Sequence, residues 1–388
     1  MAPRDRLDVL HVIGSLTAGG AERNLYYLAP EMAKSKLRYG ICCLTGRGEL
    51  AAEVESLGIP VFTLGYRRRY AAITVLRLRR LLRQRRVKII HIHLFEPGVI
   101  ARPAAWLAGV PVVITHEHGK TLWKRWHHRW FERLAARGTD LRIAVSKDIR
   151  DLRVRLERTP SEKIVLVGNA VEPSRFEVSE AAREAKRAEI GVAGSLVVGT
   201  VGRLVEAKSY DLFLEIAREV CARRPDVKFV LVGDGRLGES LRRMRDALGL
   251  ADRVLFLGNR SDIPELLAAM DLYVITSQRE GLPVSLIEAM MAAKPVVATA
   301  VGGIPENLAD GTDGVLVEPG NRQAFVEALL EVLGDPNRMR DLGRRARDKA
   351  VATYSARTIL ETLETIYVSL LIRKGVVTPT SSDRPNRR

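Results

Sequence analysis

Two glutamates on either side of a predicted helix start carry the first chemistry that this sequence offers. Glu280 precedes the turn 281–284, and Glu288 falls in the second turn of the helix that should follow. The apolar run 272–276 before them is typical of a buried parallel strand, and apolar residues after the turn recur at helical spacing. A helix that begins there would aim its free N–H groups and positive dipole end at the crevice where open α/β sheets bind ligands.

The groups around this helix start suit two kinds of ligand atom. Pro283 has no N–H, so the donors come from the residues around it: Gly281, Leu282, Val284 and Ser285. These N–H groups favour a phosphate as the ligand. The two carboxylates would lie at different heights along one side of the crevice, where they would accept hydrogen bonds from hydroxyl groups. The combination predicts a nucleotide sugar as the ligand. Two glutamates at this spacing are also common on solvated helices, so the rest of the chain has to decide.

Two cations follow another predicted strand, at 195–201. Arg203 comes directly after Gly202, and Lys208 lies five residues further on. Paired cations at a strand end suit a diphosphate, because both side chains donate charge-assisted hydrogen bonds to phosphate oxygens. We therefore expect these residues at the mouth of a ligand crevice.

Glycines and histidines mark the corresponding strand ends in the first half of the chain. Gly19 and Gly20 stand between the predicted strand 7–13 and a helix, where they either let a ligand approach the backbone or form a tight turn. The next candidates are histidines that end the strands predicted at 88–93 and 111–115: His91, His93, His116 and His118. A His-x-His pair can bind a metal, but no Asp or Cys cluster accompanies it, so we expect these histidines to line a polar crevice.

These segments resemble the retaining glycosyltransferases of family four, whose fold is called GT-B. The resemblance rests on Gly-Gly-Ala-Glu at 19–22, His-Gly at 118–119, Gly-Arg at 202–203 with Lys208, Glu-Gly-Leu-Pro at 280–283, Glu-Ala-Met at 288–290 and Gly-Gly-Ile-Pro-Glu at 302–306. It covers nearly the whole chain. It implies an α/β fold of two Rossmann-like, doubly wound domains that face a central cleft, with a C-terminal helix that crosses back to the first domain.

The resemblance also implies a role for each candidate residue. Arg203 and Lys208 would bind the diphosphate, Glu280 the sugar hydroxyls and Glu288 the ribose hydroxyls. The imidazole of His118 would lie beside the transferred sugar. If the match to the family's motif shifts by two residues, His116 would take this position. The catalytic set is then His118, Glu280, Arg203 and Lys208; the donor-binding set is Gly19, Gly20, Gly202, Arg203, Lys208, Gly281, Leu282, Pro283, Val284 and Glu288; and the acceptor side is Glu22, His93 and His116. No metal and no other cofactor is implied.

Two positions depart from the family pattern. Ser209 follows Lys208, and Ala293 stands near the end of the helix that contains Glu288, where the family usually has glycine. We therefore expect the backbone turns at both positions to have a different conformation from the corresponding turns of the family.

Length and composition limit the classes of protein. A chain of 388 residues is long for one core and predicts two domains. No run of 18 apolar residues and no signal pattern appears, so we expect a cytosolic protein. Cys42, Cys43 and Cys221 have no metal-ligand spacing and should be reduced core residues. The net charge of +16 indicates an anionic partner: nucleotide phosphates, lipid headgroups or nucleic acid.

Strands alternate with helices along both halves, which is the pattern of parallel, doubly wound sheets. The predicted strands are 7–13, 38–44, 61–64, 88–93, 111–115, 141–145 and 163–167, and then 195–201, 227–232, 253–257, 271–276, 295–299 and 314–317. The charged segment 172–194 separates the series and predicts domains at 1–178 and 179–354. A last amphipathic helix is expected at 355–375, and the polar tail 376–388 is expected to be disordered.

Two basic stretches lie in the predicted first domain. The stretch 77–86 is a helix with arginines on its outer face. The stretch 120–134 has four apolar residues at helical spacing, which form a stripe: Trp123, Trp126, Trp130 and Leu134. Basic residues flank this stripe. Such a stripe is more often packed in a core, and the alternative is a helix that lies in lipid headgroups. A lipid-linked acceptor at an anionic membrane surface would explain both stretches.

The sequence therefore predicts a retaining, metal-independent hexosyltransferase. It would move a sugar from a nucleoside-diphosphate sugar to a glycan or lipid-linked acceptor in polysaccharide or glycolipid synthesis, at the inner face of the cell membrane. One alternative is a GT-B sugar-nucleotide epimerase or phosphorylase, which would share the twin domains. A more remote alternative is a nucleic-acid-binding protein, which only the charge supports.

Overall fold

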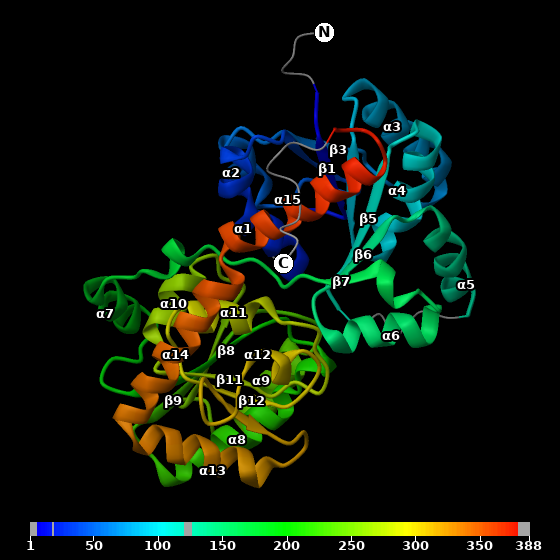
Figure 1. Ribbon diagram of the computed structural model, residues 1–388. Helices are drawn as coiled ribbons and strands as arrows, with labels where there is room; N and C mark the ends of the chain where they lie inside the picture. The colour runs from blue at the N-terminus through cyan, green and yellow to red at the C-terminus, as the bar shows by residue number, and fades with distance from the viewer. Residues whose placement is uncertain (1–5, 18, 120–125, 379–388) are drawn as a thin grey trace, which may run out of the picture. The chain divides into compact units, whose positions relative to one another are not determined.

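The computed structural model describes residues 6–17, 19–119 and 126–378, without the side chains of His127, Arg129 and Phe131. The chain divides into two compact units, one of residues 1–170 with 356–388 and the other of residues 171–355. Each unit has its own parallel sheet between helices (Figure 1). The doubly wound α/β fold expected from the alternation of strands and helices is confirmed.

The first unit is built on a seven-stranded sheet with the order β3-β2-β1-β4-β5-β6-β7. Its strands are β1 (Val9–Ile13), β2 (Tyr39–Cys43), β3 (Val61–Thr63), β4 (Ile89–His93), β5 (Val112–Glu117), β6 (Leu141–Ala144) and β7 (Ile164–Leu166). Its helices are α1 (Gly20–Lys34), α2 (Ala51–Ser56), α3 (Ala71–Gln84), α4 (Phe95–Ala108), α5 (Trp126–Ala135), α6 (Lys147–Glu157) and α15 (Ala356–Arg373). The strand order reverses between β1 and β4, so their carboxyl ends flank the crevice where such sheets bind ligands.

The second unit has a six-stranded sheet with the order β10-β9-β8-β11-β12-β13. Its strands are β8 (Leu196–Val201), β9 (Val227–Val232), β10 (Val254–Gly258), β11 (Leu272–Ile275), β12 (Val296–Thr299) and β13 (Val315–Val317). Its helices are α7 (Glu180–Glu189), α8 (Tyr210–Arg223), α9 (Gly238–Ala247), α10 (Ile263–Ala269), α11 (Val284–Met291), α12 (Ile304–Asn307), α13 (Arg322–Gly334) and α14 (Pro336–Tyr354). Here the order reverses between β8 and β11, which places the second crevice at their carboxyl ends.

The chain passes between the units at two adjacent points. Val171 forms a parallel bridge with Ser355, and its N–H donates to the carbonyl of Tyr354. The short helical turn Pro173–Phe176 packs on α10 and α11, and Phe176 is buried. Residues 171–178, expected in the first domain, therefore belong to the second unit. Helix α15 belongs to the first unit, where the carboxylate of Glu364 accepts a hydrogen bond from Tyr39 at 2.9 Å.

A buried ionic network orients α5 in the first unit. Glu132 on α5 is 1% exposed and receives two hydrogen bonds from Arg102 on α4, of 2.5 and 3.1 Å, and one of 2.7 Å from Arg142 on β6. Arg142 also donates to Glu157 of α6, at 2.5 Å. Removing one partner of such a buried pair costs about 3–5 kcal/mol, because a charge is left uncompensated. The network therefore fixes which side of α5 faces the sheet.

The opposite side of α5 faces solvent, so of the two alternatives left open by the sequence, the described part of the apolar stripe is not packed in a core. Trp126 is 79% exposed, Trp130 61% and Leu134 45%. Because Glu132 takes the inward position, the stripe at i, i+4 and i+8 points outward. Trp123, and the basic residues Lys124 and Arg125, lie outside the described residues, as does the tail 379–388.

The basic helix α3 packs as expected. Leu78 and Leu82 are buried in the core of the first unit, whereas Arg77, Arg80 and Arg83 are exposed. Cys42 and Cys43 are free and buried, and Cys221 is free and partly buried. Burial raises the pKa of the Cys43 thiol to about 12 and that of Cys221 to about 11, so these thiols are protonated at neutral pH.

Candidate functional site

The second crevice is formed by the loops that follow β8 and β11. The β8 loop carries Arg203 and Lys208, and the β11 loop carries Glu280 before α11 begins at Val284. The loops are joined by hydrogen bonds, since the N–H of Gln278 donates to the carbonyl of Ala207 at 2.9 Å. The hydroxyl of Thr276 also donates to the carbonyl oxygens of Lys208 and Ser209, at 3.0 and 3.1 Å. Two segments about 70 residues apart thus form one site, as the sequence predicted.

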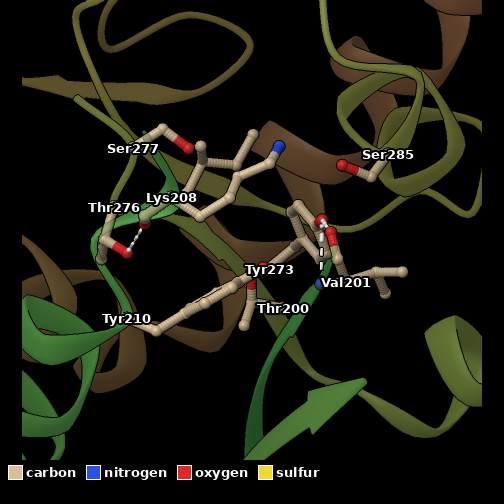
Figure 2. Close-up of a pocket in the computed structure, with 9 residues that line it drawn as sticks. Thr200, Val201, Lys208, Tyr210, Tyr273, Thr276, Ser277 and Ser285 are labelled. Carbon is tan, nitrogen blue, oxygen red and sulfur yellow. Dashed lines mark hydrogen bonds between the residues drawn. The ribbon is translucent and has the colours of Figure 1, made fainter. Parts of the chain in front are cut away.

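Lys208 and Glu280 form an ion pair in this site. Lys208 Nζ lies 2.6 Å from Glu280 Oε1, and the Ser277 hydroxyl donates to the same oxygen at 2.6 Å. Figure 2 shows the side chain of Lys208 extending across a small pocket that Thr200, Tyr210, Tyr273 and Ser285 also line. The cation and the carboxylate are therefore held together, and the cation lines this pocket.

Arg203 differs from Lys208 in having no side-chain partner among the described residues. Its side chain is exposed and makes no hydrogen bond or ion pair with any described residue. A guanidinium is always charged and has five donors, so Arg203 can bind an anion without giving up an existing contact.

Helix α11 begins as expected, with one difference. Pro283 is the N-cap residue, in an extended conformation, instead of the first helical residue. Gly281, Leu282, Pro283 and Val284 are all buried, and Glu288 is 1% exposed. Gly302 packs on the backbone of this turn, at a φ of 59°, where a Cβ would clash with the carbonyl of Glu280. The Gly-Gly segment of the sequence thus shapes the loop that carries Glu280.

Ser209 and Ala293, the two departures from the family pattern, keep the glycine-like backbone. Ser209 has a φ of 48° and Ala293 a φ of 53°, both in the left-handed region. The hydroxyl of Ser209 is also buried and finds no hydrogen-bond partner among the described residues. Our expectation that the two turns close differently is not supported, because both residues adopt the conformation that glycine favours.

The loop after β1 carries the glycines of the first unit. Gly19 caps α1, and Gly20 is exposed at the first position of the helix. A Cβ on Gly19 would clash with the carboxylate of Glu22, which folds back over the helix start. A larger residue here would therefore move the carboxylate of Glu22 away from the helix start. Ala18, between these residues and β1, lies outside the described residues.

Five histidines gather on the neighbouring strands β1, β4 and β5, from the middle of β1 and β4 to the residue after β5: His11, His91, His93, His116 and His118. The register pairs His11 with His91 and His93 with His116, so the sequence signal was a histidine near the end of each neighbouring strand. Three rings form a chain: His11 Nδ1 lies 2.9 Å from His93 Nε2, and His93 Nδ1 lies 2.9 Å from His118 Nε2. The sequence analysis missed His11.

The row of hydrogen-bonded histidine rings ends at Asn169, another residue that the sequence analysis missed. Its Oδ1 lies 3.0 Å from His118 Nδ1. Asn169 follows β7 and is buried, and the neighbouring N–H of Ala170 is held by Asn24 of α1 at 2.6 Å. Nothing in the local sequence around Asn169 pointed to a site; its partner is distant in the chain.

Burial makes these histidines neutral. Desolvation lowers the pKa of His118 to about 4 and that of His11 to about 3, and it holds the pKa values of His91, His93 and His116 well below the ordinary value. Neutral imidazoles can hydrogen-bond to a sugar but carry no charge for a phosphate.

Two groups of three histidines have ligand atoms within 4.8 Å of one another: His11, His91 and His93, and His93, His116 and His118. The ring planes are nearly parallel, at 11° for His91 with His93 and 23° for His116 with His118. Within these groups the nitrogens of neighbouring rings already lie at hydrogen-bond distance from one another, 2.9 Å for His11 with His93 and 2.9 Å for His93 with His118. Hydrogen bonds between the rings account for these short distances.

Both halves of the chain match family models. Residues 18–175 match the model described as Glycosyltransferase Family 4, and residues 182–349 match Glycosyl transferases group 1. The protein EpsF of Bacillus subtilis is 31% identical over 303 residues, which cover 74% of this chain and 78% of EpsF. The UDP-Gal:alpha-D-GlcNAc-diphosphoundecaprenol alpha-1,3-galactosyltransferase of Escherichia coli is 28% identical over 78% of this chain and 80% of its own.

A solved structure agrees with the fold and the sequence match. Alr3699/HepE of Anabaena, in complex with UDP and glucose, is 25% identical and superposes with a TM-score of 0.84, over 94% of this chain and 100% of its own. The chain therefore belongs to glycosyltransferase family 4 and has the GT-B fold.

Proposed function

We propose that this protein is a retaining, metal-independent hexosyltransferase that uses a nucleoside-diphosphate sugar. The observation that supports it best is the group of Lys208, Glu280 and Ser277 at the carboxyl ends of β8 and β11, where Arg203 also lies with no side-chain partner in the described part of the chain. Two cations and a helix N-terminus suit a diphosphate, and carboxylates suit hydroxyl groups. The Anabaena relative, solved with UDP and glucose, supports the same class of donor.

In this proposal the residues divide the donor between them. Arg203 and Lys208 bind the diphosphate, the start of α11 (Gly281 to Val284) supplies N–H groups, and Glu288 accepts from the ribose hydroxyls. Glu280 and His118 contact the sugar, and Gly19, Gly20 and Gly202 allow close approach of the backbone. Cations and helix dipole would stabilise the charge that develops on the departing diphosphate, so no metal is needed for that role.

We propose a hydroxyl of a glycan or lipid-linked acceptor as the second substrate, with Glu22, His93 and His116 on the acceptor side. The Escherichia coli relative supports this, since its name describes an acceptor linked to undecaprenyl diphosphate. An epimerase or phosphorylase with the same fold would give different products: an epimerised nucleotide sugar, or a sugar phosphate formed only when phosphate is added.

An exposed apolar and basic surface supports action at an anionic membrane. Nine of the fifteen exposed large apolar side chains among the described residues lie on or beside α3, α4 and α5: Tyr70, Ile73, Leu76, Val99, Trp106, Leu107, Trp126, Trp130 and Leu134. Figure 1 shows these helices one after another along one side of the first unit. Arg79 and Arg83 of α3 both donate to the carbonyl of Leu107 on α4, which joins the surface together.

Aromatic side chains beside arginines are typical of surfaces that lie in lipid headgroups. No helix in the described part of the chain combines the length and the apolar character that a membrane crossing requires. We therefore propose peripheral binding at the inner face of the cell membrane, in polysaccharide or glycolipid synthesis.

A thermal-shift panel of nucleotide sugars, in buffer with a chelator, tests the proposed donor class. A donor at 100 times its dissociation constant adds about 2.7 kcal/mol to the free energy of unfolding. We expect at least one UDP- or GDP-hexose to raise the melting temperature without a metal, and Arg203→Ala to lose most of the shift. No shift with any donor, with or without Mg²⁺, would contradict the proposal.

A further inference from the structure

The second unit contains a cavity that the proposed function does not use. It has a volume of about 210 Å³ and lies between the start of α8, the loop after β11, the end of β12 and the turn before α13. All of its lining residues belong to this one unit. One water molecule requires only about 10–15 Å³, whereas sites for drug-sized ligands begin at about 300 Å³. The size of the cavity therefore suits one small molecule.

The floor of the cavity is polar, but its hydroxyl groups are already engaged. Thr276, Ser277 and Thr299 line it and are at most 3% exposed. The hydroxyl of Thr276 donates to two carbonyl oxygens, and that of Ser277 donates to Glu280. The hydroxyl of Thr299 donates to the carbonyl of Ser277 at 2.6 Å. Polar contacts to a ligand must therefore come from the rim.

This floor also separates the cavity from the donor site. Thr276 and Ser277 line both the cavity and the small pocket of Lys208 that Figure 2 shows. No residue that we assign to the donor or the acceptor lines the cavity. The cavity is therefore a neighbour of the donor site and not a part of it.

The rim combines free polar groups with apolar surface. Asp211 and Gln278 are exposed, and neither side chain forms a hydrogen bond or ion pair with a described residue. A carboxylate accepts hydrogen bonds, and an amide both donates and accepts. Leu212 and Pro319 add apolar surface to the same cavity. A sugar ring matches this combination, because its C–H groups are apolar and its hydroxyl groups donate and accept.

Charge at the rim favours a neutral ligand over an anion. Glu215, which also lines the cavity, shares Arg322 with Glu219, at distances of 3.0 and 2.8 Å. With Asp211, three carboxylates at four-residue spacing along α8 therefore have one guanidinium among their described ion-pair partners. This surface is acidic in a protein whose net charge is +16. A phosphate or a uronate would be repelled here, because like charges that face one another are unfavourable.

We propose that this cavity binds one neutral sugar ring, separately from the nucleotide-sugar donor. Asp211 and Gln278 hold hydroxyl groups of the ring, and Leu212 and Pro319 pack against its C–H groups. The ring belongs either to a free monosaccharide or to one unit of a glycan, since both offer the same chemistry. The inference goes beyond the proposed function, and it can be tested without any donor.

The methyl groups of two leucines report separately on the cavity and on the donor site. Leu212 lines the cavity, whereas Leu282 lies in the turn before α11. In protein with ¹³C-labelled leucine methyl groups, spectra of Leu212→Ile and Leu282→Ile assign the two residues. We expect glucose, galactose or mannose to shift the Leu212 signals in a saturable way. Glucuronate and glycerol at the same concentrations should leave these signals in place.

The variants test the two rim groups. Asp211→Ala should weaken hexose binding at least about tenfold and Gln278→Ala about two- to tenfold, since a hydrogen bond to a charged group is the stronger one. Asp252→Ala is the matched control and should bind as wild type does. It removes another exposed carboxylate of the second unit, which also has no side-chain partner among the described residues.

A neutral trisaccharide distinguishes the two sources of the ring. Tighter binding of the trisaccharide than of its monosaccharide assigns the cavity to a glycan, whereas equal or weaker binding assigns it to a single ring. The proposal is overturned if no neutral saccharide shifts Leu212, if glucuronate or glycerol shifts it equally, or if Asp211→Ala binds hexose as wild type does. Failure of the proposed function would be seen elsewhere, as nucleotide sugars that leave Leu282 unshifted.

Discussion

The amino group of Lys208 lies 2.6 Å from Oε1 of Glu280, on which the hydroxyl of Ser277 also converges. Lys208 is 20% exposed and Glu280 10%, so the pair is largely shielded from water. An incoming diphosphate must share or displace Glu280 to reach Lys208, whereas Arg203 has no such competitor among the described residues. The two cations should therefore differ in what they do for the free protein.

The first prediction separates these two roles. Arg203→Ala and Lys208→Ala should each lower kcat/KM by about 10- to 150-fold, since a charge-assisted contact contributes about 1.5–3 kcal/mol. Lys208→Ala should also lower the melting temperature, because it leaves Glu280 without its cation. Arg203→Ala should leave it unchanged. The control is Arg345→Ala, on the exposed side of α14. Near-normal kcat/KM in both variants would reject the assigned diphosphate site.

A second prediction concerns backbone strain beside this site. Ser209→Gly and Ala293→Gly should each stabilise the protein, by roughly 0.5–1 kcal/mol, because both residues have a positive φ that costs a residue with a Cβ about 1–2 kcal/mol. Ser209→Gly also removes a buried hydroxyl for which the described part of the chain offers no hydrogen-bond partner. Urea unfolding midpoints measure the effect. Ser195→Gly, outside the left-handed region, is the control and should destabilise or do nothing; a loss of stability in both test variants would contradict the account.

A third prediction follows from the neutral histidines. Their pKa values in the folded protein are lowered, to about 4 for His118 and about 3 for His11, whereas an unfolded imidazole titrates near 6.5. The unfolded chain therefore binds more protons below pH 6.5, and stability is lost as the pH falls from there toward 4. Each such histidine contributes a slope of about 1.4 kcal/mol per pH unit. The melting temperature should be about the same at pH 7.5 and 6.5 and much lower at pH 5.5. The fall should be smaller in His11→Leu. Equal stability at pH 7.5 and 5.5 would show that the histidines are not held neutral.

A fourth prediction tests the surface of α3 to α5. Wild type should sediment with anionic but not with neutral liposomes, and less so at high salt, because screening shortens electrostatic attraction. Arg80→Glu should weaken binding at least about fivefold, since each basic residue near such a surface contributes about 1 kcal/mol. Trp126→Ser with Trp130→Ser should weaken it as well.

The variants are chosen to leave the fold of the surface intact. Arg80 is exposed and makes no side-chain hydrogen bond or ion pair with a described residue, unlike Arg79 and Arg83, which donate to the carbonyl of Leu107 on α4. Arg345→Glu makes the same charge change on α14 of the second unit and should bind as wild type does. If Arg80→Glu and Arg345→Glu behave alike, net charge alone explains the binding, and the assigned surface is wrong.

The strands could be predicted from the sequence because each is a short apolar run of the kind that a doubly wound sheet buries. The second-unit site could be predicted for a related reason: Arg203, Lys208 and Glu280 all follow such runs, and strand ends meet at one edge of a sheet. Asn169 could not be found this way, because its partner His118 is distant in sequence and only the fold joins them. Nor could the exposure of Trp126 and Trp130, which depends on the buried contacts of Glu132 with two arginines on other elements.

The most direct measurement of the central claim is the anomeric configuration of the transferred sugar, followed by ¹H NMR in the presence of a chelator. With a donor found in the thermal-shift panel, even slow transfer to water releases a free hexose whose first-formed anomer can be observed before it mutarotates. A retaining, metal-independent transferase should release the α-anomer from an α-linked donor, and Lys208→Ala should slow the release. Release of the β-anomer first, or release that stops in chelator and returns with Mg²⁺, would contradict the mechanism proposed for this site.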